Sequence, residues 1–231
     1  MVLPHPLHPG TLLRRYQRFL AEVRLSDGTV VTAHCPNSGS MKGCAIPGSP
    51  VLLSHSDNPR RKLRYTWETV QVNGVWIGIH TGRTNQLARE GIEGGVVREL
   101  QGYESIRREV RYAENSRIDL LLEFARGLCY VEVKNVTLVE DGLALFPDAV
   151  TTRGQKHLRN LMQMVREGHR AVTLFIVQRE DAGALSPADA IDPEYGKLLR
   201  EAAGAGVEVL AYQAKVAPPE IRVYRKLPVQ L

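Results

Sequence analysis

The stretch Cys129–Thr137, CYVEVKNVT, carries an acid and a base two residues apart in an otherwise apolar run that favours a strand. Side chains alternate along a strand, so Glu132 and Lys134 point to one face while Val131 and Val133 point to the other. An unpaired charge on an apolar face is costly, because burial removes it from water. The pattern therefore predicts that other charged groups complete an ionic site on this face.

A second carboxylate belongs to the same prediction. If the strands on either side of residues 125–126 form a hairpin, Asp119 lies opposite Glu132. Two carboxylates so close repel unless a cation lies between them. We therefore expect Mg²⁺ (or Mn²⁺), which takes oxygen ligands and phosphate together. Lys134 would then position or deprotonate an attacking water, or neutralise charge on phosphoryl oxygens.

The alternative is a structural Glu-Lys pair on an exposed or edge strand, since such pairs are common on protein surfaces. Two observations favour the site. Both faces of the strand are largely apolar, and Asp119 stands at hairpin distance. Charges that break the local pattern in this way are typical of functional sites.

The composition is that of a soluble globular protein, with 231 residues of which 43% are hydrophobic and 24% charged. We expect a cytoplasmic protein without a membrane partner, because no segment has the length of a membrane span or a signal peptide. Cys35, Cys44 and Cys129 form no CxxC pair. They are expected to pack as small apolar residues, although a metal site of His34, Cys35 and Cys44 is the alternative.

The first third of the chain predicts an all-β domain. Asp27-Gly28 and Asn73-Gly74 are hairpin signals, and five strands in about eighty residues indicate a small barrel of the OB type. The expected domains are residues 1–82 and 83–231. The expected strands of the barrel are residues 12–25, 29–35, 51–56, 65–72 and 75–80.

The rest of the chain alternates between helical and strand patterns, which predicts a mixed sheet with flanking helices and an α/β (α+β) fold class overall. A helix over residues 85–93 is expected to be capped by Thr84. Further helices are expected over residues 153–167 and 195–205. The expected strands are residues 105–112, 116–124, 128–139, 143–146, 171–177 and 207–212.

The net charge of +5 is unevenly distributed, because residues 1–81 hold nine Lys or Arg against four Asp or Glu. This asymmetry favours a polyanionic partner, with DNA first and RNA as an alternative. On the first strand, Phe19 and Ala21 are expected to face the core while basic and aromatic side chains face outward. The residues predicted to bind nucleic acid are Arg14, Arg15, Tyr16, Arg18, Lys42, Arg60, Arg61, Lys62 and Arg64.

Two readings of these segments stay open. The basic residues could form an ordinary solvated face over core aromatics. The loop Asn37–Gly43, NSGSMKG, could cradle a phosphate through its backbone amides, or it could be a structural turn. It lacks the spacing of a nucleotide-binding loop.

Asp119 followed by Glu132-Val133-Lys134 in a β-hairpin resembles the signature of the PD-(D/E)xK nuclease superfamily, with Ile118 where proline is frequent. Longer strings resemble the sugar fermentation stimulation protein family over nearly the whole chain. That resemblance implies an OB-like DNA-binding domain joined to a restriction-endonuclease-like domain. The strings are RRYQRFLAEV, VTAHCPNSGSMKGC, YTWE, SRIDLLLE, YVEVKNVTL, FPDAVTTRGQKHL and IDPEYG.

The resemblance also implies roles for individual residues. Asp119 and Glu132 would be metal ligands and Lys134 the catalytic lysine. Glu90 matches a helical carboxylate that superfamily members often add, or it is a solvated helix residue. In the later helix, Lys156 and His157 are candidates, with an ordinary core or surface histidine as the alternative for His157.

Two classes of function follow. The first is a Mg²⁺-dependent DNA phosphodiesterase that uses Asp119, Glu132 and Lys134. The second is a non-catalytic, non-specific DNA-binding regulator of sugar-utilisation genes, in which the nuclease fold is a scaffold. An RNA-binding or RNA-processing protein shares the barrel argument. The sequence is compatible with a monomer and with a homodimer.

Overall fold

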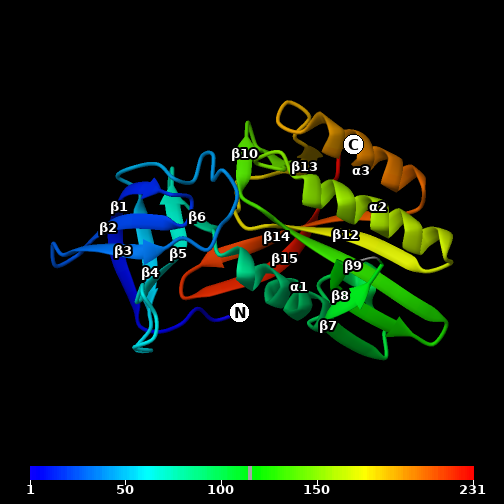
Figure 1. Cartoon of the computed structure of the whole chain (residues 1–231), viewed down its shortest axis with the longest axis horizontal. Coiled ribbons are helices and arrows are strands. Elements are labelled where there is room, and N and C mark those ends of the chain that lie inside the picture. Colours follow the sequence, from blue (N-terminus) through cyan, green and yellow to red (C-terminus); the bar gives the residue numbers. More distant parts are fainter. Residues whose placement is uncertain (114–115) are drawn as a thin grey trace.

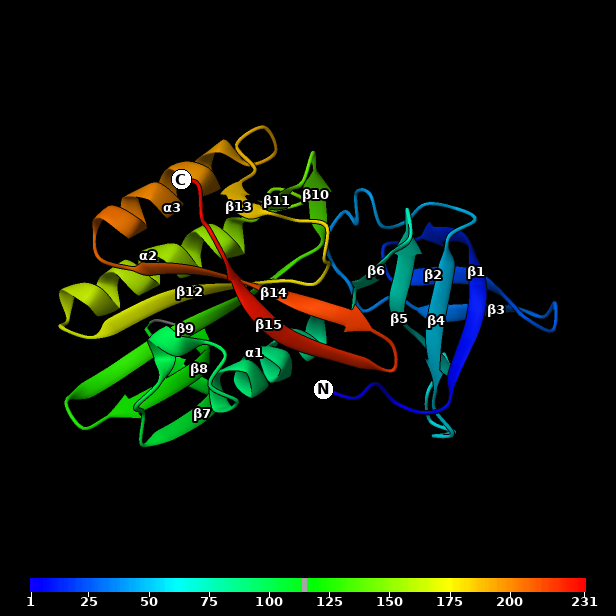
Figure 2. The same ribbon diagram turned by 180° about the vertical axis from the view of Figure 1, so that it is seen from behind.

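The computed structural model describes residues 1–113 and 116–231 (Figure 1). A β-barrel made from the first third of the chain stands beside a mixed sheet covered by helices, and the reverse view shows the same division (Figure 2). Within the described ranges, no helix has the length and apolar character needed to cross a membrane.

The barrel is a closed ring of strands in which β3 pairs in parallel with β5, through Ala33 with Tyr65 and His34 with Thr66. Closure removes the exposed edges that an open sheet would leave. A further strand, β6 (Val75–Gly78), extends β5 beyond Asn73-Gly74. The predicted OB-like, five-stranded barrel is confirmed. Its strands are β1 (Leu7–Tyr16), β2 (Leu20–Leu25), β3 (Val30–His34), β4 (Pro50–His55) and β5 (Tyr65–Val72).

Two of these strands differ from the prediction. The expected single strand over residues 12–25 is divided into β1 and β2 by a turn in which Gln17 and Arg18 have φ of 46° and 64°. Neither residue is a glycine or asparagine, so the usual signal of a left-handed turn is missing from the sequence. Arg18 therefore lies in a turn, not on the strand face of Arg14, and β6 lies outside the ring.

The second sheet has the strand order β15-β14-β12-β9-β8-β7, with β9, β12 and β14 parallel and the remaining pairs antiparallel. The predicted mixed sheet with flanking helices is confirmed. Its strands are β7 (Ser105–Tyr112), β8 (Ser116–Phe124), β9 (Gly127–Val136), β12 (Arg170–Val177), β14 (Glu208–Ala217) and β15 (Glu220–Leu227).

Helices cover both faces of this sheet (Figures 1 and 2). Helix α1 (Thr84–Glu93) packs on one face, where Leu87 and Ile92 join a fully buried core. Helices α2 (Thr152–Arg166) and α3 (Pro193–Gly204) pack on the other. A small sheet of β10 (Leu138–Glu140), β11 (Leu143–Phe146) and β13 (Ala184–Pro187) lies beside them, and short 3₁₀ turns span Thr81–Arg83 and Arg98–Leu100.

The three predicted helices are present, but the cap of one helix was predicted wrongly and two strands were omitted. Thr84 does not cap α1, because its hydroxyl donates to Asn135 Oδ1 instead, at 3.1 Å. Thr151 caps α2 by accepting a hydrogen bond from Gly154 N at 3.0 Å. Strand β13 and strand β15, which pairs with the outer edge of β14, were missing from the prediction. The expected strand over residues 128–139 is divided into β9 and β10, which belong to different sheets.

Candidate functional site

The candidate site lies on the β8–β9 hairpin at the centre of the sheet. Phe124 pairs with Gly127 and Leu120 with Val131, so residues 125–126 form the turn and the predicted register is confirmed. The ladder ends at the Leu120–Val131 pair, one step before Asp119 and Glu132, and Asp119 Oδ2 accepts a hydrogen bond from Val133 N. Asp119 is near enough to Glu132 for that charge to help raise its pKa, so the hairpin brings two carboxylates that lie thirteen residues apart in the sequence into one neighbourhood.

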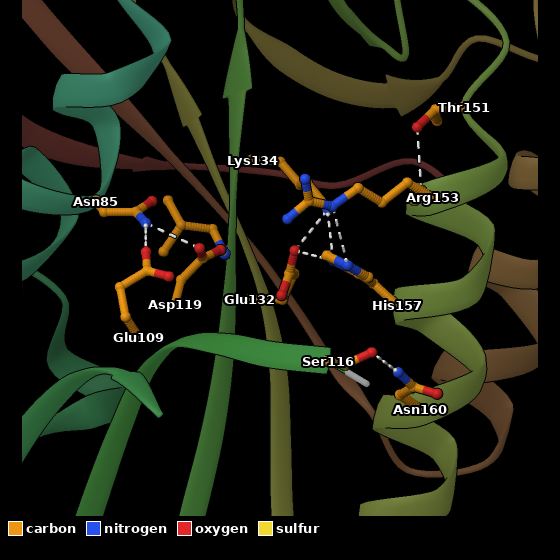
Figure 3. Close-up of polar contacts among 12 residues, drawn as sticks. Asn85, Glu109, Ser116, Asp119, Glu132, Lys134, Thr151, Arg153, His157 and Asn160 are labelled. Carbon is orange, nitrogen blue, oxygen red and sulfur yellow. Dashed lines mark hydrogen bonds and ion pairs between the residues drawn. The ribbon is translucent and has the colours of Figure 1, made fainter. Parts of the chain in front are cut away.

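The alternation of side chains breaks at Asp119. Leu120 belongs to the core beneath α1, whereas Ile118 belongs to the core beneath α2. On the neighbouring strand, Glu109 has φ of 53°, so both strands are distorted at the same level. The carboxylate of Asp119 accepts hydrogen bonds from Val133 N and from Asn85 Nδ2, each at 2.8 Å (Figure 3).

Asn85 also connects Asp119 to Glu109, whose Oε1 lies 3.3 Å from the same amide nitrogen (Figure 3). Sequence reasoning missed both residues. Strand β7 pairs with β8 through Val110 with Ile118 and Arg108 with Leu120. This register places Glu109 opposite Asp119, and nothing else in the sequence points to Glu109. That register is known only once the strands are paired.

Glu132 is buried, and one of its oxygens is occupied. Oε1 accepts from Lys134 Nζ at 2.8 Å and lies against His157 Nδ1 (Figure 3). Lys134 Nζ is also 3.5 Å from His157 Nδ1. Arg153, one helical turn before His157, donates from Nε to His157 Nε2 at 3.4 Å. Helix α2 therefore completes the ionic site that the strand alone predicts.

The two carboxylates differ in their electrostatics. Burial, together with the charge of Glu132, raises the pKa of Asp119 to about 6. Burial acts to raise the pKa of Glu132 as well, but Lys134 and His157 overcome this effect and hold that pKa below its ordinary value. At neutral pH both carboxylates are ionised, but the protein stabilises the charge of Asp119 less than that of Glu132.

The donor set fits a divalent cation that keeps water ligands. Glu132 Oε2 is buried and has no hydrogen-bond partner among the described residues. The described residues contain no group of three or more His, Cys, Asp or Glu side chains arranged for a metal. Magnesium needs no such group, because one or two carboxylates, water and substrate phosphate are its typical ligands.

Of the three site residues predicted on helices, only one lies against the carboxylates of the hairpin. Glu90 is on α1, but its contacts are an ion pair with the Met1 amine at 2.7 Å and a hydrogen bond from Gln86 at 2.9 Å. The structure therefore does not join Glu90 to the two carboxylates. On α2, His157 is buried against Glu132, whereas Lys156 is exposed.

Several residues predicted to bind nucleic acid bind within the protein instead. Arg15 donates to the carbonyl oxygens of Asn37, Gly39 and Ser40, at 2.9 to 3.0 Å, which gives it a structural task in the loop Asn37–Gly43. Lys42 pairs with Glu140 at 2.7 Å across the two domains.

Others remain on the surface. Arg14 is exposed, pairs with Glu22 at 2.9 Å and lies over the half-buried Tyr16. Arg61 donates to Thr66 Oγ1 at 2.8 Å. The exposed basic residues of the loop between β4 and β5 are Arg60, Arg61, Lys62 and Arg64.

The cysteines of the barrel pack in its core. Cys35 and Cys44 are fully buried, with Cys35 Sγ 3.3 Å from Met41 Sδ and Cys44 Sγ 3.5 Å from Thr137 O. They behave as small apolar residues with weak polar contacts.

These features define a class of two-domain proteins in which an OB barrel precedes a restriction-endonuclease-like domain. Residues 13–79 match the model of the SfsA N-terminal OB domain, and residues 82–220 match that of the sugar fermentation stimulation protein RE domain. The chain belongs to the sugar fermentation stimulation protein family, as the resemblance implies.

Relatives match over the whole chain. The sugar fermentation stimulation protein homolog of Geobacter sulfurreducens is 69% identical over 99% of this chain and 98% of its own length. The homolog of Geotalea uraniireducens is 67% identical over the full length of both chains. Among solved structures, Pyrococcus furiosus SfsA in complex with Ca²⁺ has a TM-score of 0.91 at 32% identity and covers both chains completely.

Proposed function

We propose that this protein is a Mg²⁺-dependent phosphodiesterase that binds DNA and cleaves it at the β8–β9 hairpin. The observation that carries the proposal is the clustering of Asp119, Glu132 and Lys134 in a buried site where one carboxylate oxygen has no partner among the described residues. One buried carboxylate, one half-buried carboxylate and one lysine leave a net negative charge, which a divalent cation would neutralise.

In this proposal Asp119 and Glu132 hold the metal. The ion, when bound, supplies charge neutralisation at the phosphate and lowers the pKa of a water molecule. Lys134 orients the attacking water or stabilises charge on the phosphoryl oxygens. His157 fixes the orientation of Glu132, and Asn85 does the same for Asp119. The Ca²⁺ complex of the Pyrococcus furiosus relative supports a divalent cation in this fold.

The barrel supplies the DNA-binding surface in this proposal. Its excess of positive charge includes the exposed Arg60, Lys62 and Arg64, whose side chains have no hydrogen bond or ion pair with any described residue. Side chains of this kind suit phosphate contacts that hold a strand without reading its sequence.

A nuclease assay of Lys134→Ala tests the proposal. The full-length chain is incubated with circular, linear and single-stranded DNA and with RNA, in Mg²⁺, Mn²⁺ or EDTA. We expect metal-dependent cleavage that falls by a factor on the order of 10²–10³ in the variant, because a charge aimed at the reacting phosphate is lost.

Lys197→Ala is the matched control, since Lys197 is an exposed lysine on α3 whose acidic neighbour Glu201 lies 3.8 Å away. The control should cleave as the parent does. Absence of cleavage by the parent with any metal, or equal cleavage by both variants, would contradict the proposal.

One observation favours a second candidate function, a non-catalytic DNA-binding regulator of sugar-utilisation genes. Glu132 Oε1 already has Lys134 and His157 as partners, so the ionic cluster is partly neutralised without metal. This candidate predicts salt-dependent DNA binding that Mg²⁺ and Mn²⁺ do not change. Titration calorimetry with either metal separates the two functions, because only the phosphodiesterase requires heat of binding and a rise in Tm.

A further inference from the structure

A cleft of about 270 Å³ lies between the barrel and the mixed-sheet domain. The barrel contributes Arg18 and the segment 37–39 to its walls, and the other domain contributes the segments 133–138 and 145–151. Lys134 belongs both to this wall and to the candidate site (Figure 3). Any molecule in the cleft therefore lies next to the two carboxylates.

Contacts across the domain boundary fix the width of the cleft. Asp148 Oδ2 accepts from Met41 N at 2.9 Å, and Gly78 N donates to Gln178 O at 3.0 Å. Gly39 approaches Asp148 so closely that a Cβ atom there would lie 2.4 Å from its Oδ1. Opening the cleft would break these buried bonds, which is unfavourable.

The size of the cleft limits what can enter it. Pockets for small ligands measure roughly 300–1,000 Å³, so this cleft of about 270 Å³ is slightly smaller than that range. A single nucleotide is a ligand of that class, whereas a stacked and paired duplex is much wider. With fixed walls, the cleft admits one unpaired nucleotide.

The walls carry the groups that a nucleotide needs. Arg18 Nε donates to Ser38 O at 2.7 Å, and its terminal nitrogens have no partner in the described part of the chain, so they remain for a phosphate. Asn135 Nδ2 and Asp148 Oδ1 likewise have no hydrogen-bond partner among residues 1–113 and 116–231. They offer a donor and an acceptor to a base edge.

Exposed apolar side chains flank the cleft on both domains. Phe19, next to Arg18 on the barrel, is 45% exposed, and Val150 on the opposite wall is 67% exposed. The sequence suggested that Phe19 faces the core, but the turn at Gln17 and Arg18 carries it to the surface. The Arg18 guanidinium lies 5.6 Å from the Phe19 ring centroid. An aromatic ring beside a cation is a typical stacking platform for bases.

We propose that this cleft binds one unpaired nucleotide, with its base against Phe19 and its phosphate between Arg18 and Lys134, so that the protein selects single-stranded over paired nucleic acid. The statement that this nucleotide adjoins the scissile phosphate rests on the proposed phosphodiesterase function. The binding preference itself does not require cleavage.

The test measures binding by fluorescence anisotropy in EDTA, where no metal-dependent cleavage occurs. The full-length chain is titrated with labelled oligothymidylate, oligouridylate and a hairpin duplex of equal length. We expect tighter binding of a single strand than of the duplex. Phe19→Ala should weaken single-strand binding roughly tenfold and leave duplex binding unchanged, because one stacked base is lost.

Val30→Ala is the control, since Val30 is 50% exposed and lies at the opposite end of the β2–β3 hairpin from Phe19. It should bind like the parent. Duplex binding as tight as single-strand binding, or equal affinities for Phe19→Ala and Val30→Ala, would overturn the inference. Preference for either oligothymidylate or oligouridylate over the duplex supports it.

The two proposals fail separately. Single-strand preference without metal-dependent cleavage would support the nucleotide-binding cleft and contradict the phosphodiesterase function. Cleavage of duplex and single strands at equal rates, with no effect of Phe19→Ala on binding, would support the phosphodiesterase function and contradict the nucleotide-binding cleft.

Discussion

Among residues 1–113 and 116–231, each domain buries one glutamate, and the hydrogen bonds of the two side chains differ. In the barrel, Glu68 accepts from Ser54 Oγ at 2.6 Å and from two nitrogens of Arg83 at 2.7 and 2.8 Å, so both of its oxygens are occupied. In the mixed-sheet domain, Glu132 has partners on Oε1, whereas Oε2 has none among the described residues.

The difference separates a structural ion pair from a site that can accept a ligand. A bidentate arginine satisfies a buried carboxylate with fixed geometry and leaves no lone pair that requires another partner. Glu132 is paired with a lysine and a histidine, which leave an oxygen without a donor. Burial alone therefore does not distinguish a functional carboxylate, but incomplete pairing does.

The largest effect is expected for Glu68→Ala. Removal of one partner leaves the Arg83 guanidinium partly buried without its carboxylate, which costs about 3–5 kcal/mol in buried pairs. We expect a loss of this order in the free energy of unfolding, measured by urea denaturation, with Mn²⁺ binding by the folded protein unchanged. A loss below about 1 kcal/mol would show that the Glu68–Arg83 ion pair contributes little to stability, as an exposed pair does.

Glu132→Gln should affect the metal more than the fold. The amide keeps the shape of the side chain but removes the charge. Loss of a group that only hydrogen-bonds to a metal ligand lowers metal affinity roughly 10- to 100-fold, so we expect Mn²⁺ affinity to fall by at least this much when a ligand itself is changed. Titration calorimetry measures this change. Glu140→Gln, at an exposed glutamate paired with Lys42, is the control and should bind Mn²⁺ as the parent does.

Metal binding should weaken as the pH falls below about 6, because the raised pKa of Asp119 means that a proton then competes for this carboxylate. Affinity should drop about tenfold per pH unit in that range. In the metal-free protein, ionised Asp119 lowers the free energy of unfolding, because its pKa is higher in the folded state than in the unfolded state. This destabilisation is absent below the ordinary pKa of 3.8 and reaches its full size above about pH 6, so stability falls as the pH rises through this range.

Calorimetric titrations with Mn²⁺ at pH 7.5, 6 and 5 check this dependence, and Asp119→Asn should abolish it. A midpoint near 4 would mean that Asp119 is not desolvated as the structure indicates.

The smallest effect is expected at the barrel surface. Neutralising Arg60 or Arg64 by glutamine should weaken DNA binding in a manner independent of sequence. Each change should lower the slope of log K against log salt concentration by about 1 if that side chain contacts a phosphate. Arg200→Gln is the control, because Arg200 lies on α3 and pairs with Asp189. An unchanged slope would remove these arginines from the binding surface.

Local pattern was enough to predict much of the fold. The Asn73-Gly74 turn, the alternation around Glu132 and Lys134, and the helical spacing in residues 152–166 all correspond to observed elements. The errors fall where local sequence carries no signal. Gln17 and Arg18 form a left-handed turn without glycine, and the distortion at Glu109 has no sequence signature either.

Among the site residues, the hairpin register could be predicted because a two-residue turn determines which residues face each other. The partners from outside the hairpin could not. His157 and Lys156 are adjacent on α2, and only the packing of that helix on the sheet turns His157 toward Glu132 and leaves Lys156 exposed. Arg15 and Arg18 looked equivalent, yet Arg15 binds three carbonyl oxygens of its own domain.

By itself the sequence determined the two domains' fold types and the acid-base pair on β9, because turn chemistry and side-chain alternation are local properties of the backbone. The tertiary structure alone decided which carboxylate is desolvated, which arginine is available and where a nucleotide could lie. These properties depend on distances between segments far apart in the chain, and such distances exist only after the barrel and the sheet have packed together.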